Sequence, residues 1–148
     1  MASLKQVKEL TELAFRLKLD GTEIFEEFKN TEMAGIFNGI GPDRMPEWMR
    51  GAINFLHPSL IVVAFIHDLE FEKGGDRQTF EASNTRFRTN GYIVAKANYG
   101  WYNPLRYIVM SKARRFAFYC QQFGWSAWAA PSDGTANPKK QRKEKVNA

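Results

Sequence analysis

The spacing of apolar residues is the feature that most constrains the fold of this chain. Apolar side chains recur every three or four residues along several segments, and no long segment alternates apolar and polar residues. Spacings of three and four place side chains on one face of an α-helix, whereas a half-buried β-strand requires alternation. The sequence therefore predicts an all-α fold.

Local start and stop signals divide this pattern into separate helices. Ser3 is a suitable N-cap for the first helix, Asp20-Gly21 breaks the chain after it, and proline at 46 and 58 can begin later helices. Gly74-Gly75 and Gly124 end helices, and residues 99–104 form a turn. The predicted helices are 4–18, 22–29, 47–55, 58–73, 77–97 and 105–123.

Residues 35–42 interrupt the helical pattern. This segment, GIFNGIGP, holds three glycines and a proline in eight residues. Such a density opposes both helix and strand, so we expect a loop with unusual backbone angles throughout the segment.

Length and charge indicate one domain with a basic tail. A chain of 148 residues fits a single domain, which we place at 1–130. Residues 131–148 carry five cationic and two acidic side chains and one valine, and we expect them to be disordered. Such a tail contacts nucleic acid or an anionic membrane, or is simply a solvated extension, and the sequence leaves both interpretations open.

Cysteine content and the first residues indicate a reducing environment. Cys120 is the single cysteine, so the chain forms no internal disulfide, and its aromatic neighbours predict that it is buried. The first helix is amphipathic and shows no signal-peptide pattern. We therefore expect a protein that stays in the cell that makes it, or in a particle assembled there.

His67 and Asp68 carry the clearest chemical signal. They precede the Gly74-Gly75 break by about two helical turns, and the next helix should return antiparallel to theirs. Reflection through that break places His67 opposite position 81 or 84, so Glu81 or Asn84 can meet its ring. A histidine held through one ring nitrogen, with the other free for water, is the arrangement of a general base.

Asp68 points away from His67 around the helix. It can face the glycine-rich segment, whose backbone would expose carbonyl oxygens, and Asp43 adds a weaker candidate carboxylate. Carbonyl and carboxylate oxygens are the ligands of calcium, so these positions predict a calcium site.

Four short motifs together resemble a known family. They are NGIGP at 38–42, HDLEF at 67–71, SNTRF at 83–87 and FYCQQFG at 118–124. Over roughly residues 35–128 the chain resembles the phospholipase A2 fold, and more closely the cysteine-poor, phospholipase A2-like small proteins of bacteriophages.

The resemblance implies roles for individual residues. His67 would activate water, and Phe71 stands where the family usually has tyrosine. The family's second aspartate, which orients the histidine, falls on Asn84, and Glu81 one turn earlier is the alternative partner. The implied calcium ligands are the carbonyls of Phe37, Gly39 and Gly41 and the carboxylate of Asp68.

Two functions of different classes follow from this resemblance. The first is calcium-assisted hydrolysis of a lipid ester at a phospholipid or membrane surface, which the intact His67 and Asp68 favour. The second is a structural or host-interaction protein of a phage, with phage or host proteins as partners and a relic site, which Asn84 and the basic tail favour. Nucleic-acid binding through the tail is a third possibility. For each we expect the virion or the cytoplasm of an infected bacterium.

Some side chains have both a functional and a packing interpretation. His57 precedes a proline and is predicted to be a loop residue or helix cap. One group of aromatic residues suits either a lipid interface or packing, and we favour packing: Trp101, Tyr102, Trp125 and Trp128. One group of arginines suits either a phosphate-binding patch or a solvated helix face, and we favour the latter: Arg77, Arg86, Arg88, Arg114 and Arg115.

Overall fold

Helices form every regular element of the described structure. The structure is a computed structural model, and it describes residues 3–37 and 56–128. Within those ranges every regular element is an α-helix or a 3-10 helix, so the predicted all-α class is confirmed. The predicted helix 47–55 and the tail 131–148 lie outside the described residues.

The N-terminal part begins as predicted. Helix α1 spans Leu4–Arg16, and a capping box joins Ser3 and Gln6 at its start. Val7 and Ala14 are its fully buried residues. The break predicted at Asp20-Gly21 is present, because Gly21 adopts a left-handed φ of 86° and a 3-10 helix, η1, follows at Thr22–Glu27.

The second α-helix corrects the prediction for the glycine-rich segment. Helix α2 spans Asn30–Ile36, so Gly35 and Ile36 form its last turn and do not belong to a loop. Glu32 bonds the backbone N–H of Lys29 at the start of this helix. Gly35 is exposed, and a Cβ added there would meet no other atom within 4 Å, so this glycine costs only about 1 kcal/mol of helix propensity.

Three longer helices form the rest of the described chain. A 3-10 turn, η2 at Pro58–Leu60, leads into α4 at Ile61–Lys73, which Gly74 ends as predicted. Asp76 caps α5 at Arg77–Asn98, and Asn103 caps α6 at Pro104–Phe123. The 3-10 helix η3 at Gly124–Ala127 then returns Trp128 to the core. No helix in the described ranges is long and apolar enough to cross a membrane.

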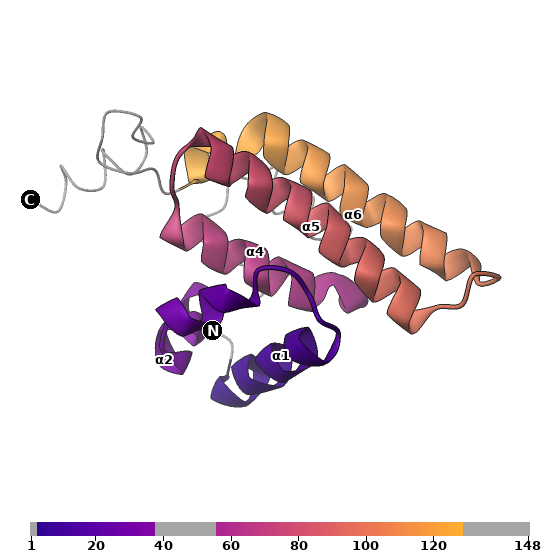
Figure 1. Ribbon diagram of the computed structural model, residues 1–148, viewed down its shortest axis with the longest axis horizontal. Helices are drawn as coiled ribbons and strands as arrows, with labels where there is room; N and C mark the ends of the chain where they lie inside the picture. Colours follow the sequence, from indigo (N-terminus) through magenta and orange to yellow (C-terminus); the bar gives the residue numbers. More distant parts are fainter. Residues whose placement is uncertain (1–2, 38–55, 129–148) are drawn as a thin grey trace, which may run out of the picture.

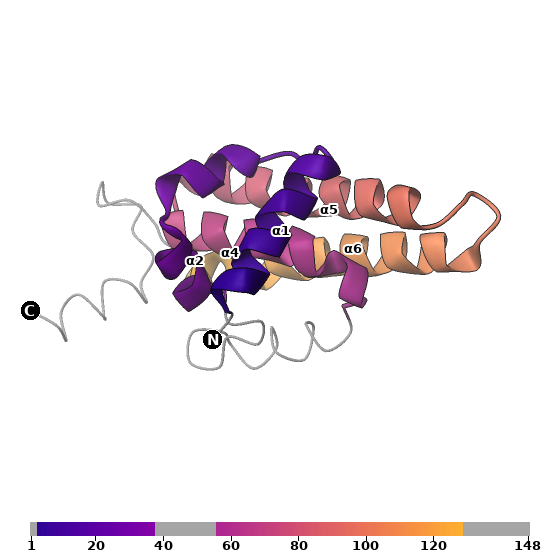
Figure 2. The same ribbon diagram turned by 90° about the horizontal axis from the view of Figure 1, so that it is seen from below.

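Helix α4 is the central element. In Figure 1, α1 and α2 lie on one side of it and the α5–α6 pair on the other. Figure 2 shows α1 running across α4, whereas α5 and α6 run side by side. Helix α5 lies close to α6 at Gly91, where a Cβ would be 2.4 Å from the Cβ of Ala113. Only glycine allows this approach.

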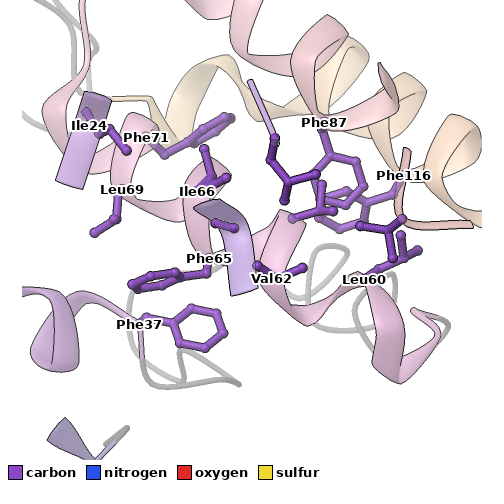
Figure 3. Packing of buried hydrophobic residues seen from close by; sticks show 14 of the residues in the cluster. Ile24, Phe37, Leu60, Val62, Phe65, Ile66, Leu69, Phe71, Phe87 and Phe116 are labelled. Atoms are coloured by element: carbon purple, nitrogen blue, oxygen red, sulfur yellow. The ribbon is translucent and has the colours of Figure 1, made fainter. Parts of the chain in front are cut away.

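Aromatic rings fill the space on both sides of α4. Phe65 stacks on Phe25 of η1, with ring centroids 5.4 Å apart, and Phe37 packs edge-on against it at 5.1 Å (Figure 3). On the other side, Phe87 of α5 and Phe116 of α6 are 4.6 Å apart. Burying each such side chain stabilises the fold by about 1.5–3 kcal/mol.

A polar cluster attaches the N-terminal layer to α5. The Asn90 side chain accepts from the backbone N–H of Asp20 at 2.8 Å and donates to the backbone carbonyl of Asp20 at 2.9 Å. Arg86 bonds the carboxylates of Asp20 at 3.0 Å and Glu70 at 2.7 Å. Gly21 lies against this cluster, where a Cβ would be 2.6 Å from Arg86 Cδ.

Candidate functional site

His67 lies on the face of α4 that packs against α5. Its side chain is 2% exposed. The ring Nε2 lies 2.9 Å from Oδ1 of Asn84 on α5, so the predicted contact between His67 and position 84 is present. Because α4 and α5 are antiparallel around the Gly74-Gly75 break, the two residues meet although 17 positions separate them.

A third helix fixes the Asn84 amide. Asn84 Nδ2 donates to Gln121 Oε1 on α6 at 2.9 Å, which turns Asn84 Oδ1 toward the histidine. In this arrangement His67 Nε2 carries the proton and donates it to Asn84. His67 Nδ1 then has a lone pair, and it has no hydrogen-bond partner among the described residues. Gln121 is absent from the predicted site, although positions 84 and 121 are equally far from the turn near residue 102.

Aromatic rings surround the imidazole. Ring centroids lie 4.4 Å away for Phe71, 5.2 Å for Phe87 and 5.9 Å for Phe116. Burial lowers the pKa of His67 to about 4, while the bond to Asn84 opposes this shift and the charge of Arg86 adds to it. The imidazole is therefore neutral near pH 7, with an unprotonated Nδ1 that can accept a proton but holds it weakly.

Glu81 does not reach the site. Its carboxylate lies 3.5 Å from Arg77, and both side chains are 53% exposed. Of the two alternatives predicted as partners of His67, Asn84 is therefore present and Glu81 is wrong. The stripe of α5 that faces α4 and α6 runs through Phe80, Asn84 and Phe87, because the large apolar residues set which side of the helix is buried.

Asp68 occupies a different side of α4 from His67. Burial raises the pKa of Asp68 to about 7. Burial also raises the pKa of Cys120 on α6, and the negative charge of Asp68 raises it further. Phe37 packs on Phe65, which precedes Asp68 by three positions on α4.

These features fit a hard cation at Asp68. A carboxyl with a raised pKa is one that a cation would stabilise in its charged form, and carboxylate with main-chain carbonyl oxygens is the ligand set of calcium. Gly39, Gly41 and Asp43 lie outside the described residues. Within residues 3–37 and 56–128 no three His, Cys, Asp or Glu side chains gather as a metal site.

The remaining candidate residues take different positions. His57 is a helix cap, as predicted, because its Nδ1 accepts from the backbone N–H of Ser59. Cys120 is fully buried, as predicted. Trp128 is buried and donates to the carbonyl of Gly75 at 2.9 Å, so packing is confirmed for this residue.

Two surface predictions need correction. Packing is wrong for Trp101 and Tyr102, which are 75% and 77% exposed. Arg86 does not lie on a solvated face, because it bonds Asp20 and Glu70. The other four arginines are exposed, as predicted: Arg77, Arg88, Arg114 and Arg115. The guanidinium of Arg77 also lies 5.0 Å from the rings of Phe80 and Trp125.

Comparisons with known proteins give no match to a family model, a curated protein or a solved structure. The interpretation of the site therefore depends on the motifs and contacts of this chain alone.

Proposed function

We propose that the chain is a phospholipase A2-like hydrolase of lipid esters in which His67 is the general base. The observation that carries the proposal is the state of the imidazole: Nε2 is held by Asn84 at 2.9 Å, and Nδ1 has no partner in the described chain. A general base needs one ring nitrogen fixed and the other within reach of a water molecule. Because Nδ1 is buried, the active form of the site would have to admit that water.

The residues around His67 predict slow turnover. His67 Nδ1 would take the proton of the attacking water, and the ring would become positively charged. Asn84 fixes the tautomer, but a neutral amide does not stabilise that charge as a carboxylate does. A pKa of about 4 for His67 agrees with a weak base.

The proposed cofactor is calcium. Asp68 would supply the carboxylate, and the backbone carbonyls of Phe37, Gly39 and Gly41 would complete the site. When bound, the ion would polarise the ester carbonyl and stabilise negative charge on its oxygen.

A non-catalytic role is the second candidate, and a specific observation favours it. Three aromatic rings surround a side chain that is 2% exposed, and this is also how a packed core histidine is placed. In this case the chain would be a phage structural or interaction protein that retains the fold and a relic site, with phage or host proteins as its partners.

The Asn84→Asp variant distinguishes the two candidates. The new carboxylate would stabilise the charged imidazole, and the Gln121 amide can turn to donate to it. In a comparable catalytic dyad the exchange of carboxylate for amide costs about 10⁴-fold in turnover. With calcium present, we expect hydrolysis of a short-chain phospholipid to rise by roughly 10³-fold or more. Glu81→Gln, on an exposed face of the same helix, is the matched control and should leave the rate unchanged.

Two further measurements make the outcome decisive. The ring pKa of His67, followed by NMR, should rise in the Asn84→Asp variant, which shows that the new carboxylate is in place. The activity gained should then disappear on adding His67→Gln or on chelating calcium. If the pKa rises and no ester is hydrolysed, the hydrolase proposal is wrong and the non-catalytic role remains.

A further inference from the structure

The charges of this chain are separated along its length. Residues 82–123, which form most of α5 and all of α6, contain seven Lys and Arg residues and no Asp or Glu. Arg86 is neutralised by Asp20 and Glu70. In the described chain the other six form no ion pair within 4.0 Å. They are Arg88, Lys96, Arg106, Lys112, Arg114 and Arg115.

The same two helices also expose many large apolar side chains. Trp101 and Tyr102 at the α5–α6 turn are 75% and 77% exposed, and Phe118 is 59% exposed. Figure 1 shows this turn projecting past the end of α4. The exposed apolar residues of the α5–α6 pair are Ile93, Trp101, Tyr102, Leu105, Tyr107, Ile108, Phe118, Tyr119 and Phe123.

One face of α6 carries both apolar and cationic side chains. Spacings of three and four place five residues on that face, in the order Leu105, Ile108, Lys112, Arg115 and Tyr119. The face that α6 buries holds Val109, Ala113, Phe116 and Cys120, and it lies about 100° around the helix from this exposed face. Helix α6 therefore buries one apolar face in the core and exposes a second face, which is both apolar and basic, to solvent.

This combination identifies the chemistry of a partner. A second copy placed symmetrically on α6 would bring Lys112 and Arg115 against the same cations, which is unfavourable. A phosphate backbone would pair with the cations, but aliphatic side chains gain nothing from it. An anionic bilayer satisfies both sets, because the headgroups pair with Lys and Arg while Trp, Tyr and aliphatic groups enter the interface.

We propose that the outer face of the α5–α6 pair, with Trp101 and Tyr102 at its tip, docks on the surface of an anionic phospholipid bilayer. Trp101 and Tyr102 enter the headgroup region at the tip. Arg114 and Arg115 pair with lipid phosphates farther along α6. This docking requires no hydrolysis at His67, so it stands or fails separately from the proposed function.

Vesicle sedimentation with the full chain tests this proposal. The vesicles consist of ether-linked phosphatidylglycerol, which an esterase does not cleave, or of phosphatidylcholine. We expect binding to phosphatidylglycerol that weakens steeply with salt, and little binding to phosphatidylcholine. Because each cation near an anionic surface contributes about a fivefold change in affinity, Arg114→Ser with Arg115→Ser should weaken binding roughly 25-fold.

Matched controls separate docking from net charge. Lys5→Ser with Lys8→Ser removes the same charge from exposed positions of α1 and should change binding less than threefold. Trp101→Ser should weaken binding and remove the blue shift of tryptophan fluorescence on adding vesicles, whereas Leu4→Ser on α1, at a 54% exposed position, should do neither. The basic tail is present in every variant, so its contribution is constant.

Several results would overturn the proposal. One is equal weakening by the α1 and α6 charge variants, which would indicate a general charge effect. Another is an absence of vesicle binding at low salt in a protein whose circular dichroism shows intact helices. A third is salt-sensitive retention on single-stranded DNA without vesicle binding, which would assign the face to nucleic acid.

Discussion

Replacing Gly91 with alanine should destabilise the protein, although alanine is the better helix former. The added Cβ would lie 2.4 Å from the Cβ of Ala113, whereas ordinary contact begins at 3.4 Å. Helices α5 and α6 would have to separate by about 1 Å along a long shared interface. Overpacking costs about 1–3 kcal/mol, and so short a distance falls in the upper part of that range, about 2–3 kcal/mol. The higher helix propensity of alanine offsets about 1 kcal/mol of this cost. We therefore expect a net loss of about 1–2 kcal/mol in the free energy of unfolding.

Urea denaturation followed by circular dichroism measures this loss. Gly35→Ala is the matched control, because Gly35 is helical and exposed with open space around it, and it should stabilise the protein by up to about 1 kcal/mol. Ala113→Gly combined with Gly91→Ala moves the methyl group from α6 to α5, so the double variant should be more stable than the sum of the single changes. A Gly91→Ala variant as stable as the wild type would show that α5 and α6 accommodate the methyl group without strain.

Two further predictions concern buried charge. Arg86→Met should lower the free energy of unfolding by about 2–4 kcal/mol in urea denaturation, because it leaves Glu70 buried without its cation. Adding Glu70→Gln should recover part of this loss, and an equal loss in the single and double variants would contradict the prediction. The lowered pKa of His67 makes stability fall as pH decreases from about 6.5 to 4, and the raised pKa of Asp68 makes stability fall as pH increases from about 4 to 7. In the wild type these two slopes oppose each other. Relative to wild type, His67→Gln should therefore lose stability toward higher pH and Asp68→Asn toward lower pH, each at about 1.4 kcal/mol per pH unit. Urea midpoints measured near pH 4.5 and pH 6.5 that change in the same direction in both variants would exclude this.

The sequence predicts the contacts that depend on local symmetry. The Gly74-Gly75 break fixes two antiparallel helices, and reflection through it is enough to bring Asn84 to His67. The same reflection leaves two candidates one turn apart. Choosing between them needs the rotation of α5 about its axis, which is set by packing against α4 and α6 and not by the break itself.

Other features depend on contacts that no local pattern contains. Helix α2 escapes sequence-based prediction because Gly35 lies in its last turn, where glycine costs little and the residues that follow resemble a loop. The bonds of Arg86 to Asp20 and Glu70 join α5 to α4 and to the turn between α1 and η1. An arginine on an amphipathic helix gives no sign in the sequence that it is partly buried. The exposure of Trp101 is equally hidden, because tryptophan is usually placed in a core.

The attachment of Asp20 to Asn90 has a consequence for the order of folding. These hydrogen bonds join residues 70 positions apart, whereas α5 and α6 pair across a short turn. Closing the longer loop costs more conformational entropy, so the hairpin of α5 and α6 should assemble before α1 and η1 dock. On unfolding the order reverses, and the backbone amides of the N-terminal layer should exchange with solvent through openings that leave the hairpin paired.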